Sequence, residues 1–316
     1  MTTAVYSHAD CKLHEMGHWH PESPARLQAI EDQLIASRSA DFLEYREAPL
    51  ATDAMITRVH AQACMDLMRA HLPAADAGAG AYYPLDPDTS MNPHSLRAAQ
   101  RAAGAAVAAV DAVIAGEIAN AFCAVRPPGH HARLSAPMGF CFFNNVAIAA
   151  RHALDVHGLE RIAIVDFDVH HGNGTEEAFV DDARVMMTSF FQFPFYPCND
   201  KAAMPAQRAH MLNHPVPAYS GGEVVRKLVT DSWLPALHAH RPQMIFISAG
   251  FDAHREDDLG QMGLVEADYA WITQQIMAVA LDHAGGRIVS CLEGGYNLSA
   301  LGRSVTAHVR ALAQLD

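Results

Sequence analysis

The chain has 316 residues, of which 50% are hydrophobic, and a formal net charge of −13 at pH 7. This length and apolar content suit one large α/β domain covering residues 1–316. The acidic balance argues against a nucleic-acid partner, because neutralising phosphates requires a surplus of Lys and Arg.

No signal for secretion or for a membrane is evident. The six cysteines are scattered without a CxxC spacing, which indicates reduced thiols rather than disulfides or a thiolate metal site. The first residues, MTTAVYSHAD, lack the charged and apolar regions of a signal peptide. No apolar run approaches the ~20 residues of a membrane span. We therefore expect a cytoplasmic protein without a membrane partner.

Apolar runs rich in β-branched residues alternate along the chain with longer stretches of helical character. The predicted strands are residues 118–125, 162–168, 185–190, 244–248 and 287–292. The predicted helices are residues 94–115, 144–157, 221–240, 265–283 and 299–313. This alternation predicts a mostly parallel sheet, and the nearly continuous apolar strands predict helices on both of its faces. Residues 75–93, rich in Ala, Gly, Asp and Pro, are predicted to form a surface loop.

Polar motifs directly follow four of the five predicted strands. They lie at residues 126–131, 166–170, 248–252 and 293–296. Ligands of open parallel sheets bind at the carboxyl ends of the strands. The sequence therefore predicts one functional site at this edge.

Asp168, His170 and Asp252 are candidate metal ligands. In the segment IAIVDFDVHHGN, Asp166, Asp168 and His170 occupy alternate positions, so in an extended chain they would project from one side. Asp252 ends a second apolar run, MIFISAGFD. Two carboxylates and an imidazole suit a divalent metal with room for water. One acidic residue after a strand would be read as a cap or turn former, but the combination favours a metal site.

Further motifs offer groups for acid–base chemistry and for binding. In RPPGHHA, His130 and His131 could act as a general base and its electrostatic partner, or could be incidental to a turn in a chain with 20 histidines. In EGGY, glycines permit close approach and Tyr296 could donate to an oxyanion, or it could be an ordinary half-buried tyrosine. In GFCFFNN, Phe140 could line an apolar channel or belong to the core.

The segments RPPGHHA, GFCFFNN, DFDVHHGNGT, SAGFDAH and EGGYN resemble, in order and spacing, the zinc-dependent histone deacetylase superfamily. That superfamily includes acetylpolyamine amidohydrolases and shares the arginase-like fold. The resemblance extends from about Tyr6 to about Val309, and GNGT and HPESPARL are similar to the class II and bacterial branch. It implies a single-domain arginase/deacetylase-like α/β fold.

The resemblance also implies roles for individual residues. It assigns one catalytic Zn²⁺ to Asp168, His170 and Asp252, general-base and general-acid chemistry to His131, and electrostatic stabilisation to His130, held by Asp166. Tyr296 would polarise the acyl carbonyl, and Asn173 would orient His131 where class I members carry aspartate. A structural K⁺ would share Asp166, Asp168 and the His170 carbonyl with Ser189 and Phe190.

Substrate-binding positions follow from the same resemblance. One channel wall would be Phe140, the opposite wall would lie near Phe195 or Tyr196, Asp88 would be the rim aspartate and Leu259 the gate. Gly139 and Gly294 complete this predicted binding set. Two departures concern the rim: Cys198-Asn199-Asp200 stands where the family usually has Gly-Thr-Gly, and Asp258-Leu259 stands where many members have Pro-Leu.

The apolar Leu259 favours an amidohydrolase that removes acetyl or other acyl groups from lysine side chains or similar acylated amines. The alternative is a small-molecule amidohydrolase such as an acetylpolyamine deacetylase. A non-catalytic acyl-lysine reader is disfavoured because every catalytic position is filled, and an arginase-type dimanganese enzyme because it needs further acidic ligands. Zn²⁺ and Fe²⁺ would both fit the ligands. Acyl length, physiological substrate and a homo-oligomeric state stay open at this stage.

Overall fold

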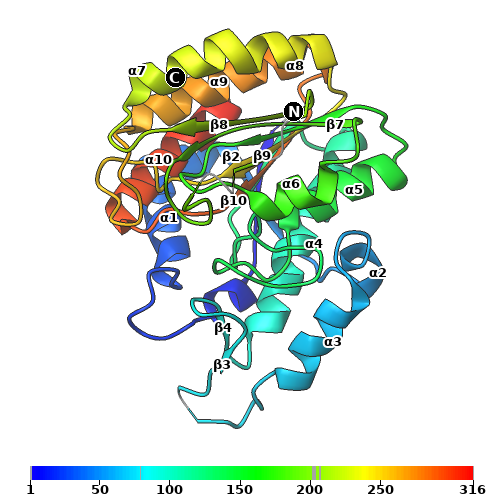
Figure 1. Cartoon of the computed structure of the whole chain (residues 1–316), viewed down its shortest axis with the longest axis vertical. Coiled ribbons are helices and arrows are strands. Elements are labelled where there is room, and N and C mark those ends of the chain that lie inside the picture. The colour runs from blue at the N-terminus through cyan, green and yellow to red at the C-terminus, as the bar shows by residue number, and fades with distance from the viewer. Residues whose placement is uncertain (1, 79, 201–203, 206–207, 316) are drawn as a thin grey trace.

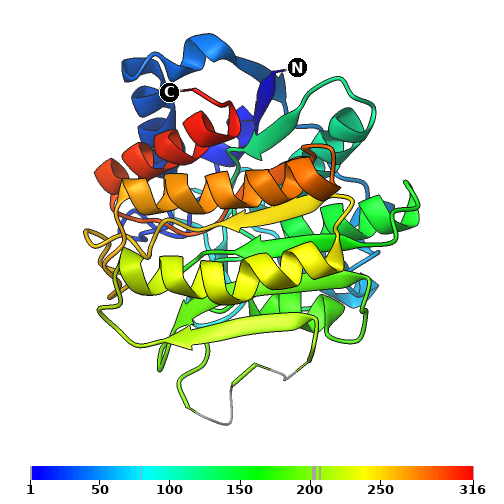
Figure 2. The same cartoon turned by 90° about the horizontal axis from the view of Figure 1, so that it is seen from above.

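The computed structural model describes residues 2–78, 80–200, 204–205 and 208–315. At its centre is an eight-stranded sheet of order β2-β1-β5-β10-β9-β6-β7-β8, in which every neighbouring pair is parallel. Figures 1 and 2 show this sheet between two layers of helices. The strands are β1 (Thr3–Ser7), β2 (Leu43–Glu47), β5 (Asn120–Cys123), β6 (Ile162–Asp166), β7 (Val185–Gln192), β8 (Met211–Val216), β9 (Ile245–Ala249) and β10 (Ile288–Leu292).

The predicted fold class is confirmed, and all five predicted strands are present in the sheet. The strands of this sheet that the sequence did not reveal are β1, β2 and β8. β2 and β8 form the two edges, where one side of a strand meets solvent and polar residues are tolerated. β8 even contains Pro215, which an edge strand accepts because its N–H is not needed there.

Helices cover both faces of the sheet (Figures 1 and 2). One layer contains α1 (Ala25–Ala36), α7 (Gly222–Leu228), α8 (Leu234–His240), α9 (Glu266–His283) and α10 (Leu298–Leu312). The other contains α4 (Ser95–Ile114), α5 (Asn145–Asp155) and the short α6 (Asn173–Phe179). Alanine and valine bury one side of α4 closely against the sheet, which explains its alanine-rich sequence.

The helix predicted at residues 221–240 is interrupted. A π-helical turn, Val229–Trp233, separates α7 from α8. Pro235 follows this turn and has no N–H to donate to the carbonyl four residues earlier, so a regular α-helix cannot continue through it. None of the described helices has the length and apolar character needed to cross a membrane.

The loop predicted at residues 75–93 is only partly a loop. Its second half folds into an antiparallel hairpin, β3 (Tyr83–Pro84) and β4 (Ser90–Met91). The hairpin packs with α2 (Asp53–Ile56), α3 (Gln62–His71) and one side of α4 around a second apolar cluster that includes Met65, Met68 and Met91. The sequence did not reveal α1, α2, α3 or α6.

Four neighbouring strands, β5, β10, β9 and β6, occupy the middle of the sheet. Their registers pair Cys123 with Cys291, and Asp166 with Ser248. The polar motifs that follow these strands therefore emerge side by side at the carboxyl edge, as the sequence predicted.

Candidate active site

The three predicted metal ligands converge. His170 Nδ1 lies 3.0 Å from Asp168 Oδ1 and 3.2 Å from Asp252 Oδ2. The three candidate ligand atoms all lie within 4.8 Å of one another, and both carboxylates are fully buried. Asp166, the last residue of β6, lies next to this cluster: its Oδ2 is 3.0 Å from His130 Nδ1, and Asp168 Oδ1 is 3.8 Å from Nε2 of the same imidazole.

Backbone groups hold the two carboxylates in place. Gly294 N–H donates to Asp168 Oδ2 (2.9 Å) and Val169 N–H donates to Asp252 Oδ1 (3.0 Å). A Cβ on Gly250 would lie 2.0 Å from Asp168 Oδ2, and one on Gly294 would lie 2.0 Å from Asp252 Oδ2. Only glycine therefore leaves room for the carboxylates at these two positions.

The donor set fits a divalent cation. Asp252 Oδ2 is buried and accepts no well-aligned hydrogen bond, although His170 Nδ1 lies 3.2 Å away. Burial raises the pKa of Asp252 to about 7, and the neighbouring charge of Asp168 contributes to the rise. Such a pair of buried carboxylates is stabilised by a cation between them. One imidazole and two carboxylates match the ligands of a three-coordinate protein site that keeps a position open for water or substrate.

The adjacent histidines have different partners. His130 Nδ1 lies 3.0 Å from Asp166 Oδ2, and His131 Nδ1 lies 2.8 Å from Asn173 Oδ1. Because the amide oxygen of Asn173 can only accept, His131 donates through Nδ1 and keeps Nε2 free to accept a proton. The loop before them is held by Glu293, whose Oε2 accepts the N–H groups of Gly129 (2.6 Å) and His130 (3.0 Å).

The different surroundings of the two imidazoles shift their pKa values in opposite directions. Burial alone would lower the pKa of His130, but the carboxylates of Asp168 and Asp166 raise it to about 10. Burial lowers the pKa of His131 well below its usual value, and the imidazoles of His130 and His170 lower it further. These shifts favour the protonated form of His130 and the neutral form of His131.

A cavity of about 280 Å³ leads to this cluster. All the predicted binding residues line it, namely Asp88, Gly139, Phe140, Tyr196, Leu259 and Gly294. Phe195 lines it as well and stacks on the His170 ring (centroids 5.3 Å apart, planes at 16°), so both candidates for the opposite wall contribute. Phe195 N–H donates to the Cys198 carbonyl (3.3 Å), so the altered rim sequence still turns back beside the cavity.

Tyr296 completes the lining. Its ring meets Phe140 edge-on, with centroids 5.8 Å apart. Burial raises the pKa of the phenol well above its usual value, and the charge of Asp252 contributes. The phenol therefore keeps its proton at neutral pH and is available as a donor in the cavity.

Comparison with known proteins decides the family. The family described as histone deacetylase domain matches residues 20–312. The histone deacetylase-like amidohydrolase of Pseudomonas aeruginosa is 38% identical over 282 residues, which cover 88% of this chain and 73% of that protein. The chain belongs to the histone deacetylase family.

Two further relatives agree with this assignment. The crystal structure of the HDA15 HD domain matches with a TM-score of 0.89 at 33% identity, covering 100% of this chain and 90% of that one. The polyamine deacetylase HDAC10 of Mus musculus is 39% identical over 231 residues, which cover 70% of this chain and 34% of that protein. The prediction of a deacetylase that hydrolyses amides other than peptide bonds is confirmed.

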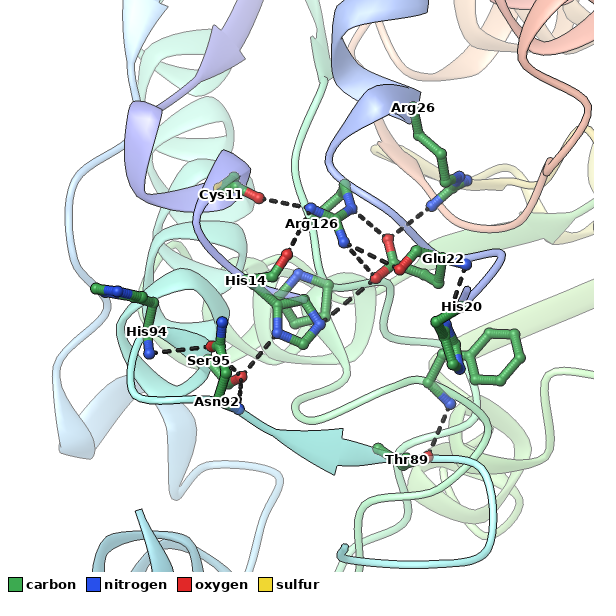
Figure 3. A network of polar contacts seen from close by, with 12 residues as sticks. Cys11, His14, His20, Glu22, Arg26, Thr89, Asn92, His94, Ser95 and Arg126 are labelled. Carbon is green, nitrogen blue, oxygen red and sulfur yellow. Dashed lines mark hydrogen bonds and ion pairs between the residues drawn. The ribbon is translucent and has the colours of Figure 1, made fainter. Parts of the chain in front are cut away.

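The deacetylase also contains a buried ionic network that sequence reasoning missed (Figure 3). Glu22, fully buried, binds the guanidinium groups of Arg26 (Nη1 to Oε1, 3.1 Å) and Arg126 (Nη2 to Oε2, 2.7 Å). Arg126 also donates to the carbonyls of Cys11 (2.9 Å) and His14 (3.0 Å). Burial would raise the pKa of Glu22, but Arg126 and the other partners lower it well below its usual value. The network fixes the amino-terminal segment against the loop that leads to the paired histidines.

Arg26 extends this network to the tyrosine loop. Its guanidinium donates to the carbonyls of Gly295 (Nε, 2.6 Å) and Glu293 (Nη2, 2.5 Å) and lies 5.0 Å from the centre of the Tyr296 ring. The motif HPESPARL, which is similar to the class II and bacterial branch, contains both Glu22 and Arg26. Nothing in the residue pattern itself indicated that Arg26 reaches a loop near the other end of the chain.

Proposed function

We propose that this deacetylase removes acetyl or other acyl groups from lysine side chains, with one zinc ion held by Asp168, His170 and Asp252. The observation that carries the proposal is the convergence of these ligands at the end of an apolar cavity that also presents paired imidazoles and a phenol. When bound, zinc would supply Lewis acidity toward the acyl oxygen and toward water. The ligand set also accepts Fe²⁺, so the native metal needs a direct measurement.

The protein groups divide the remaining chemistry. His131, neutral and with Nε2 free, takes the proton from the attacking water and returns one to the leaving amine. Tyr296 donates its O–H to the acyl oxygen as negative charge develops there. His130, whose protonated form is favoured by Asp168 and Asp166, contributes positive charge on the same side of the cavity, and Asn173 orients His131. Catalytic roles are therefore proposed for His130, His131 and Tyr296, and supporting roles for Asp166 and Asn173.

The cavity lining supports an acyl-lysine substrate. Phe140, Tyr196 and Leu259, the residue proposed as the gate, line the cavity and suit the alkyl part of a lysine side chain. Gly139 and Gly294 let that side chain approach closely. Asp88, on the hairpin between β3 and β4, is placed to accept hydrogen bonds from a peptide backbone at the rim.

An acetylpolyamine is the alternative substrate, and one observation favours it. Asp258, exposed and next to Leu259, lines the same cavity and could pair with a second ammonium group of a polyamine. The mouse relative is itself named a polyamine deacetylase.

We further propose a structural K⁺ held by Asp166, Asp168 and the His170 carbonyl together with Ser189 and Phe190. In support, Ser189 on β7 is the register partner of Asp166 on β6. We also propose that residues 1–316 form one catalytic domain and that it acts in the cytoplasm. The six free cysteines are consistent with a reducing compartment.

The substrate proposal is tested by kinetics on matched panels. Zinc-loaded enzyme is assayed on peptides carrying acyl-lysines of increasing acyl length and on acetylated polyamines. We expect the higher kcat/KM for an acyl-lysine peptide, and a preference of about 100-fold for a polyamine would overturn that choice of substrate. In that case Asp258→Asn lowers kcat/KM for the polyamine more than for the peptide.

A further inference from the structure

Asp257 joins two loops that are distant in the sequence. Its side chain is 5% exposed. Oδ2 accepts the backbone N–H groups of Tyr296 (2.6 Å) and Asn297 (2.9 Å), and Oδ1 accepts the N–H of Leu259 (3.0 Å). Burial raises the pKa of Asp257, while its backbone hydrogen bonds act to lower it. One buried carboxylate therefore holds three main-chain donors from two segments.

Both segments carry residues of the active-site cavity. Leu259 lines it on one segment and Tyr296 on the other. The tyrosine loop is also held by Arg26, which donates to the carbonyls of Glu293 and Gly295. A carboxylate thus fixes the N–H groups of this loop while a guanidinium fixes its carbonyl groups.

We propose that Asp257 is a positioning residue that fixes the backbone of Tyr296 and of the gate residue Leu259 as one unit. The same carboxylate then sets the place of the phenol and the width of the channel beside it. This inference rests on the proposed role of Tyr296 as donor to the acyl oxygen. It goes further, because it assigns the alignment of the Tyr296 phenol to Asp257, a residue that does not line the cavity.

The placement has a kinetic consequence. A displacement of about 1 Å at a reacting group can cost about 100-fold in rate. Removing Asp257 leaves the N–H groups of Tyr296 and Leu259 without their acceptor, so both backbone segments are free to shift. A loss of kcat through Tyr296 and a rise in KM through Leu259 are therefore expected together.

The test is a double-mutant cycle on the zinc-loaded, full-length protein with an acyl-lysine peptide as substrate. Tyr296→Phe is expected to lower kcat by about 100- to 1,000-fold, as loss of an oxyanion donor does. Asp257→Ala is expected to lower kcat by about 10- to 100-fold and to raise KM. If Asp257 acts through Tyr296, the double variant has a kcat within about threefold of Tyr296→Phe alone, because residues acting as a unit are not additive.

Asp268→Ala is the matched control for a purely structural effect. Asp268 is equally buried, at 5% exposed, and accepts the Val265 N–H (3.0 Å) and the Arg226 guanidinium (2.9 Å) at the start of α9, outside the cavity lining. We expect it to lower the thermal midpoint while kcat and KM stay at the wild-type values. Asp257→Asn, which keeps the side-chain shape and one acceptor, repeats the cycle if Asp257→Ala does not fold.

The outcomes separate the inference from the proposed function. Multiplicative losses in the double variant, or an equal loss of kcat in Asp268→Ala, would overturn the positioning role alone. An unchanged kcat and KM in folded Asp257→Asn would do the same. Wild-type turnover by Tyr296→Phe would instead remove Tyr296 from the proposed mechanism, and the inference about Asp257 would fail with it.

Discussion

His130 and His131 are neighbours in the chain, and their ring centroids lie 4.0 Å apart, but they differ in what each Nδ1 meets. The partner of His130 is the buried carboxylate of Asp166, whereas the partner of His131 is the neutral amide of Asn173. The pKa of the first imidazole is raised to about 10 and that of the second is lowered well below its usual value. Two identical side chains therefore take different roles because the charges around each ring differ: two carboxylates raise the pKa of His130, whereas burial and two neighbouring imidazoles lower that of His131.

The two environments also act on one another. A protonated His130 disfavours a second positive charge on His131, so the charged member of the pair helps to keep the other member neutral. A neutral imidazole with Nε2 free is what a general base requires at neutral pH. A fixed positive charge beside it is suited to a developing oxyanion.

Replacing either histidine by asparagine is expected to have the largest effect on activity. The asparagine amide reaches about as far as Nδ1, so both His130→Asn and His131→Asn can keep a hydrogen bond to their partners while Nε2 is lost. We expect His131→Asn to lower kcat by about 1,000-fold, the usual scale for a general acid–base group, and His130→Asn to lower it less. Steady-state kinetics at matched zinc content gives the answer. Equal losses, or a larger loss in His130→Asn, would contradict the assigned roles.

Asn173→Asp is expected to have a smaller effect, on the pH profile of kcat/KM. It places a carboxylate behind His131 and so makes the two environments alike. A carboxylate favours the protonated imidazole, and the pKa of His131 rises. Because the base must be neutral to react, the acidic limb of the pH profile of kcat/KM should move to higher pH. The profile of Asn173→Asp beside that of the wild type measures this shift, and an unmoved limb would show that Asn173 does not control the titration of His131.

The central strands and the metal cluster were predictable because each depends on short stretches of sequence. β6 and β9 are buried on both faces and read as continuous apolar runs, and Asp168 and Asp252 follow directly after them. The edge strands β2 and β8 carry polar residues and a proline, so their sequences do not differ from those of loops.

The supporting groups of the site were not predictable in the same way. Arg26 and Gly295, whose hydrogen bond holds the tyrosine loop, are separated by 269 positions, and Asp257 and Tyr296 by 39. No local pattern marks such pairs, since a buried arginine and a buried aspartate resemble surface residues in the sequence. Their partners are backbone groups, which carry no sequence signal at all.

The central claim is that Asp168, His170 and Asp252 hold one catalytic metal ion. Elemental analysis and deacetylation assays on the same purified samples, before and after removal of metal by a chelator and after addition of zinc, test it most directly. The account predicts one zinc per active chain, loss of activity on its removal, recovery on its return, and no bound zinc in Asp252→Ala. Undiminished hydrolysis of acyl-lysine by a fully metal-free sample would contradict it.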